Sequence, residues 1–163
     1  MEINSLKSEI SSDTALKILK KKEPSLKIRS LELIYYPYFR VIASVKTKLL
    51  AKKVDGSISC IVDLVNGTEA LTGDINKKIQ ISVDRNNVLQ ISIDMDDARK
   101  KALSFIRHAV LQKMKVLKVP KITLESEDFL YKPYWIIHCI GKQKNDFYLL
   151  MDSINGSFHL LQP

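Results

Sequence analysis

The chain has 163 residues, of which 45% are hydrophobic and 27% are charged, a balance that allows one or two buried cores. Two cysteines, five glycines and five prolines exclude a disulfide scaffold, a collagen-like chain and a disordered, linker-rich chain. The formal net charge of +8 favours a polyanionic partner, but the excess is spread along the chain rather than gathered in a basic tail.

The first expected element is a short helix. Ser12 or Asp13 can cap it, and it should end at Lys22 because Pro24 follows. Ile3, Leu6 and Ile10 are expected to form an earlier turn packed beside this helix. The N-terminal residues lack the basic and apolar regions of an export signal, so a cytoplasmic location is expected.

An aromatic-rich strand follows the helix. In residues 34–42 (IYYPYFRVI), period-2 alternation places Pro37, Phe39 and Val41 on one face, which is expected to be the core face. Tyr38 and Arg40 fall on the opposite face. A second strand, residues 58–65, leads to Asn66-Gly67, a pair preferred in tight turns, and a short third strand is expected through residues 68–71.

The segment between residues 76 and 95 has the pattern of a connecting hairpin. Apolar residues alternate in 79–83 and again in 89–93, and residues 84–87 (DRNN) separate them as a turn. A long helix is then predicted over residues 98–118, because Asp96 and Asp97 suit a helix N-terminus and apolar residues fall on one stripe.

The two aromatic strands indicate an internal duplication. Residues 130–138 (LYKPYWIIH) share the order apolar-Tyr-x-Pro-Tyr-aromatic with residues 34–42. Each segment is followed by apolar-apolar-Asp-x-apolar-Asn-Gly, at 61–67 and again at 150–156. The sequence therefore predicts an α+β protein of two tandem helix-plus-antiparallel-sheet modules packed as a pseudo-twofold pair. The predicted ranges are 1–75 for the first repeat, 76–95 for the hairpin and 96–163 for the second repeat.

The order of these elements resembles the PepSY domain and its cystatin-like relatives. The matching residues are 62–67 (VDLVNG) and 151–156 (MDSING), with Asn where the family usually has Thr before Gly. The resemblance covers residues 12–72 and 96–162. It implies a non-catalytic binding or regulatory module, because such domains occur in protease propeptides and membrane-associated regulators.

Asp63 and Asp152 are the candidate pair of functional carboxylates. If they approached each other, mutual repulsion would raise one pKa, as general acid catalysis requires. The alternative interpretation is that each carboxylate holds its own turn, together with Asn66 and Gly67 or with Asn155 and Gly156. We prefer the turn interpretation.

Binding residues are expected on two surfaces. Tyr38, Tyr134 and Arg40 lie on the outer strand face, where tyrosines could contact a ligand, although we prefer core or inter-copy packing as the explanation for the aromatic residues. Lys100, Arg107 and Lys115 lie on one side of the long helix, where they could form a phosphate-binding surface, although we prefer an ordinary solvated face.

No catalytic set, cofactor motif or metal-ligand spacing is found in the sequence, so no cofactor or metal is expected. The expected partner is a protein or peptide of unknown identity, and the alternative is a nucleic acid bound by the basic helix and exposed tyrosines. No stretch is long and apolar enough to span a membrane. Exposed strand edges would also allow two chains to pair as a homodimer.

Overall fold

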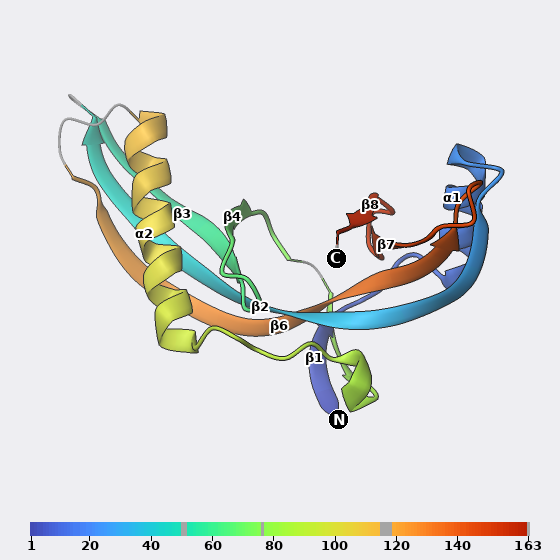
Figure 1. Ribbon diagram of the computed structural model, residues 1–163. Helices are drawn as coiled ribbons and strands as arrows, with labels where there is room; N and C mark the ends of the chain where they lie inside the picture. The colour runs from blue at the N-terminus through green and yellow to red at the C-terminus, as the bar shows by residue number, and fades with distance from the viewer. Residues whose placement is uncertain (50–51, 76, 115–118, 163) are drawn as a thin grey trace. The chain divides into compact units, whose positions relative to one another are not determined.

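The computed structural model describes residues 1–49, 52–75, 77–114 and 119–162 (Figure 1). These residues form two α-helices, one 3-10 turn and eight strands with mixed, mostly antiparallel pairing, so the predicted α+β class is confirmed. The elements are β1 (Glu2–Leu6), α1 (Ser12–Lys22), β2 (Lys27–Leu49), β3 (Lys52–Asp63), β4 (Glu69–Thr72), β5 (Lys78–Ser82), α2 (Met95–Met114), β6 (Lys121–Ile140), β7 (Asp146–Asp152) and β8 (Phe158–Leu161).

The chain divides into two compact units, and each unit combines segments that are far apart in the sequence. Unit 1 contains Met1–Tyr36, Lys77–Leu89 and Tyr131–Pro163, and unit 2 contains Pro37–Asn76 and Gln90–Leu130. These units differ from the predicted ranges 1–75, 76–95 and 96–163. Each unit takes its helix from one predicted copy and its hairpin from the other.

Unit 2 is built on the hairpin of the first predicted copy. Strands β2 and β3 pair antiparallel from Tyr38 opposite Asp63 onward, and β4 pairs with β3. The predicted core face is confirmed, because Phe39 and Val41 are buried along with the residues that follow them on that face. Helix α2 covers this face (Figure 1), burying Ala98, Ala102, Ile106 and Val110 against it.

Unit 1 is built on the hairpin of the second predicted copy. Strands β6 and β7 pair antiparallel from Tyr134 opposite Asp152 to Ile140 opposite Asp146, and β8 pairs with β7. Helix α1 supplies Ala15 and Leu19 to a buried cluster that also holds Ile10, Ile137, Cys139, Leu149 and Met151. The helix that precedes the first hairpin in the sequence therefore covers the second hairpin.

Both helices begin where the sequence favours it. Ser11, just before the predicted cap, accepts a hydrogen bond from Thr14 N at 3.3 Å and caps α1, which ends at Lys22. Asp94 Oδ1 accepts from Asp97 N at 2.9 Å at the start of α2. The predicted helix 98–118 is observed from Met95 to Met114, and residues 115–118 lie outside the described residues.

Two expected elements near the N-terminus and the middle of the chain differ in the structure. The expected turn around Ile3 and Leu6 is strand β1, whose residues pair antiparallel with β5. Strand β5 does not form a hairpin with residues 89–93, because those residues are not in a strand. Instead, Leu89 N donates to the Tyr35 carbonyl at 3.1 Å. Alternation identified β5 correctly but did not identify its partner, because a distant strand replaced the adjacent one.

Candidate functional site

The first Asn-Gly turn, in unit 2, is held by the side chain of Asp63. Its Oδ1 atom accepts hydrogen bonds from Val65 N at 2.8 Å and from Asn66 N at 3.1 Å. Asn66 Oδ1 in turn accepts from Thr68 N at 2.8 Å. Gly67 adopts φ of 80°, a conformation that favours glycine. Asp63 thus has the contacts of the turn interpretation.

The second Asn-Gly turn, in unit 1, repeats this arrangement. Asp152 Oδ1 accepts from Ile154 N at 2.8 Å and from Asn155 N at 3.4 Å, and Asn155 Oδ1 accepts from Ser157 N at 2.8 Å. Gly156 has φ of 77°. Both candidate carboxylates therefore bind the backbone of their own turns, and each belongs to a different unit.

Asp152 also has a cationic partner that sequence reasoning missed. Lys132 Nζ donates to Asp152 Oδ2 at 2.6 Å, and the same ammonium lies 5.1 Å from the centre of the Tyr134 ring. Burial lowers the pKa of Lys132, but the hydrogen bonds to Asp152 and Tyr134 and the negative charge of Asp152 more than offset burial, so the pKa is raised above its ordinary value. Lys132 is therefore a charged, half-buried anchor for the turn.

The predicted outer-face residues are half-buried and engaged in contacts. Tyr134 meets the ring of Tyr36 edge-on, with centroids 6.0 Å apart. The Arg40 side chain is only 14% exposed, and its Nη2 donates to Asp128 Oδ2 at 3.0 Å. Tyr38 and Arg40 belong to unit 2 and Tyr134 belongs to unit 1. These contacts favour a packing role over an open aromatic platform.

The basic side of α2 is solvated over its described part. Lys100 and Arg107 are exposed, and Lys101 Nζ lies 3.3 Å from Glu69 Oε1. A shallow hollow beside the helix is lined by Lys100, Lys101, Ser104, Phe105, His108 and Glu69. The predicted residue Lys115 lies outside the described residues.

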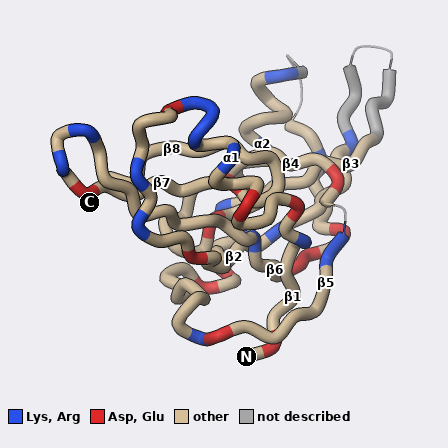
Figure 2. The backbone as a smooth tube through the Cα atoms, turned by 90° about the vertical axis from the view of Figure 1, so that its right-hand side faces the viewer, with Lys and Arg blue, Asp and Glu red and all other residues tan. Residues whose placement is uncertain are grey.

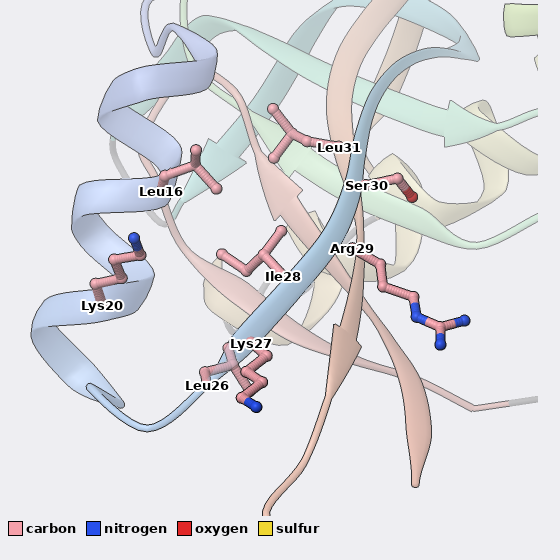
Figure 3. A pocket seen from close by; sticks show the side chains of 8 residues that line it. All are labelled: Leu16, Lys20, Leu26, Lys27, Ile28, Arg29, Ser30 and Leu31. Atoms are coloured by element: carbon pink, nitrogen blue, oxygen red, sulfur yellow. The ribbon is translucent and has the colours of Figure 1, made fainter. Parts of the chain in front are cut away.

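A groove that sequence reasoning missed lies in unit 1, between α1 and the start of β2 (Figure 3). Its volume is about 640 Å³. Leu16 of the helix faces Ile28 and Leu31 of the strand, whereas Arg29 and Ser30 point away from the helix. The lining residues are Leu16, Lys20, Leu26, Lys27, Ile28, Arg29, Ser30 and Leu31. The groove thus has an apolar floor and basic side chains at its rim.

The strand that forms one wall of this groove has an open edge. Strand β3 pairs with β2 only from Tyr38 onward. In the part of the chain that the structure describes, no strand continues along that side of β2 over residues 27–34. At Tyr35, β2 forms a single parallel β-bridge with Val88. Backbone groups along residues 27–34 are therefore open to an added strand.

The sequence contains part of the information that indicates the groove. Residues 20–22 are three consecutive lysines in the last turn of α1, and residues 26–31 (LKIRSL) mix basic and apolar side chains. Strict alternation breaks at Arg29 and Ser30, which kept the predicted strand from starting before residue 34. Only the folded chain brings this segment beside Leu16.

Another cluster at the end of unit 1 contains His138. Its ring stacks on Tyr148 with centroids 4.6 Å apart, and its Nε2 lies 3.5 Å from Asp146 Oδ2. Tyr148 is 46% exposed, making it more accessible than either predicted tyrosine. Among the described residues, no group of three or more His, Cys, Asp or Glu side chains could hold a metal ion.

Comparison with family models, with curated proteins and with solved structures finds no match to this chain. Among the described helices, none is long and apolar enough to cross a membrane.

Proposed function

We propose that this protein is a non-catalytic binding module that holds a protein or peptide partner in the groove between α1 and β2. The observation that carries the proposal is the combination, in unit 1, of an apolar groove and an open strand edge along the same residues, 27–31. A groove supplies pockets for side chains and an edge supplies backbone hydrogen bonds, which together are the two requirements of peptide recognition by strand addition.

The module would consist of two PepSY-like or cystatin-like repeats that have exchanged their helices. Matching hydrogen bonds support this part of the proposal. Leu64 N donates to the Pro37 carbonyl at 3.1 Å, and Ser153 N donates to the Pro133 carbonyl at 3.4 Å. Both Tyr-x-Pro-Tyr segments thus hold the following turn in the same way.

The segments that precede the helices match as well. The Leu64 carbonyl accepts from Ser92 N and Ile93 N, just before α2. The Ser153 carbonyl accepts from Glu9 N and Ile10 N, just before α1. In each case the chain entering a helix binds the turn of the other predicted copy, and these anchors support the proposed exchange of helices.

The contacts of the two turn carboxylates, Asp63 and Asp152, support a non-catalytic function. A general acid or nucleophile must be free to reach a substrate. Asp63 and Asp152 instead accept two backbone hydrogen bonds each, and Asp152 also accepts from Lys132. These interactions use the carboxylates as supports for the turns.

A nucleic-acid-associated function is the second candidate. It is favoured by the exposed Lys100 and Arg107 on α2 and by the exposed Tyr148 stacked on His138. Basic side chains bind phosphates and exposed aromatic rings stack on bases. In this alternative the partner would bind at α2 and Tyr148 and not in the groove, so the binding surface distinguishes the two candidates.

The test is nuclear magnetic resonance mapping on the full ¹⁵N-labelled chain. Three probes are added in turn: an extended acidic peptide, an extended basic peptide with the same apolar residues, and a single-stranded oligonucleotide. We expect a peptide to shift amide signals of residues 16–31. If the oligonucleotide alone shifts signals, at α2 or Tyr148, the second candidate replaces the first. If no probe shifts residues 16–31, the proposed function is wrong.

A further inference from the structure

We propose that the occupant of the groove is an extended acidic peptide that adds a strand to the open edge of β2 over residues 27–34. This inference rests on the proposed function and names the chemistry of the partner. Every second side chain of an added strand points the same way. The apolar side chains of one set would enter the groove, whereas the acidic side chains of the other set would lie on the opposite face, on the side toward which Arg29 projects.

The floor of the groove selects apolar side chains. Ile28 and Leu31 pack against the cluster that holds Ala15 and Leu19 of α1, so this wall is fixed by the core of unit 1. Leu16 completes the groove from the helix side (Figure 3). A preformed apolar site of this kind binds apolar side chains without first having to reorganise.

The rim of the groove selects negative charge. Lys20, Lys27 and Arg29 line it, and Lys21 and Lys22 lie in the last turn of α1. Figure 2 shows lysine and arginine positions around α1, β7 and β8. Asp146 lies 3.9 Å from Arg29, with both side chains more than half exposed, so it neutralises the rim weakly. Glu23 and Glu32 are exposed acids of the same stretch, but neither lines the groove. Acidic residues of a peptide would be attracted and oriented there.

A separate peptide fits this edge better than a second copy of the chain or a nucleic acid. Ile28 and Leu31 both point toward α1 while Arg29 and Ser30 point away, so the strand alternation is interrupted. Interrupted edges disfavour pairing between two rigid copies, whereas a short flexible peptide can follow the interruption. A nucleic acid would satisfy the basic rim but leave the apolar floor unused.

The test uses fluorescence anisotropy with the full chain and a labelled peptide of about eight residues, a typical strand length, that alternates Glu and Val. Two further versions carry N-methyl groups on alternate amides, one in each register, so that each lacks one of the two sets of donors. We expect the parent peptide to bind and one N-methylated version to bind about tenfold more weakly, the loss of roughly one or two hydrogen bonds.

Protein variants test the rim. The triple variant Lys20→Glu, Lys27→Glu, Arg29→Glu should weaken binding by at least about tenfold. The matched control is Lys100→Glu, Arg107→Glu on α2, which changes exposed basic residues outside the groove and should leave the affinity within about twofold. A peptide alternating Lys and Val should not compete.

Several results would overturn the inference. Equal binding of the Glu-Val and Lys-Val peptides would contradict charge selection. Binding of both N-methylated versions with the affinity of the parent peptide would contradict strand addition. Competition by an oligonucleotide, with steep salt dependence, would identify the rim as a nucleic-acid site. If the acidic peptide fails while the basic peptide shifts residues 16–31, this inference fails and the proposed binding function survives.

Discussion

The indole Nε1 of Trp135 donates a hydrogen bond to the carbonyl of Ile10 at 2.9 Å. Trp135 lies on β6 in the second predicted copy, and Ile10 precedes α1 in the first. This bond fixes the entrance to α1 against the hairpin that the helix covers. In unit 2 the matching strand position is Phe39, which has no such donor, so unit 1 has one anchor that unit 2 lacks.

Replacing this anchor should weaken the fold measurably. Trp135→Phe removes the indole donor and leaves the Ile10 carbonyl without it. We expect the free energy of unfolding to fall by about 1 kcal/mol or somewhat more, since buried area is also lost. Urea denaturation followed by circular dichroism measures the change. Tyr148→Phe, at an exposed ring, is the control and should stay within about 0.5 kcal/mol. Equal effects would show that the bond contributes nothing.

The two turn glycines should not tolerate a side chain. At Gly67 an added Cβ would lie 2.7 Å from Ile93 Cδ1, and at Gly156 it would lie 3.0 Å from the Cδ1 atoms of Ile10 and Ile18. Both glycines also have positive φ. Gly67→Ala and Gly156→Ala should each lower the free energy of unfolding by about 1–2 kcal/mol from backbone strain, before any clash.

Gly73 provides the matched control for the glycine variants. An added Cβ at Gly73 meets nothing within 4 Å. Gly73→Ala should therefore change the thermal unfolding midpoint very little. A Gly73 variant as unstable as the two turn variants would show that the turn geometry is not the cause.

Because Lys132 binds Asp152, replacing Asp152 should lower the free energy of unfolding more than replacing Asp63 does. Asp63→Ala removes two backbone hydrogen bonds and is expected to cost about 1–2 kcal/mol of stability. Asp152→Ala removes the equivalent bonds and also leaves the half-buried Lys132 without this partner, so about 2–4 kcal/mol is expected. Chemical denaturation compares the two variants. In a Lys132→Met background the Asp152→Ala cost should approach that of Asp63→Ala, and an unchanged cost would refute the role of the ion pair.

Cys60 should make stability depend on alkaline pH. Burial raises the pKa of this thiol from 9.0 to about 11. Between these values the unfolded chain loses the proton while the folded chain keeps it. The stability that the protonated Cys60 thiol contributes is therefore fully present below pH 9 and is lost as the pH rises to about 11. The loss attributable to Cys60 is about 2–3 kcal/mol. Denaturation curves at pH 8 to 11 should show a shallower decline for Cys60→Ala, and identical declines would contradict the assignment.

Much of the local structure was predictable because it depends on short-range patterns. The core face that starts at Pro37 and Phe39 follows from period-2 alternation, and the Asn-Gly turns follow from the residue types that accept positive φ. The outer-face tyrosines were placed on the right strands, but their half-buried state depends on neighbours such as Tyr36 that alternation cannot identify.

The pairing of distant segments was not predictable in the same way. An amphipathic stripe shows which residues of α1 are buried, such as Leu19, but not which sheet buries them. Strand β5 likewise has the pattern of a strand and pairs with β1, far away in the sequence. The groove beside Leu16 could not be predicted because it depends on both pairings. The position of α1 forms one wall, and the edge of β2 over residues 27–34 stays open only because no strand pairs with it among the described residues.

The proposed exchange of helices is most directly tested by methyl nuclear Overhauser effects from Leu19. In the structure Leu19 shares a buried cluster with Ile137 and Met151, whereas Val41 and Val62 belong to the cluster covered by α2. The expected result is cross-peaks from the Leu19 methyl groups to those of Ile137 and Met151. Cross-peaks to Val41 and Val62 instead would place α1 on the hairpin of its own copy and contradict the exchange.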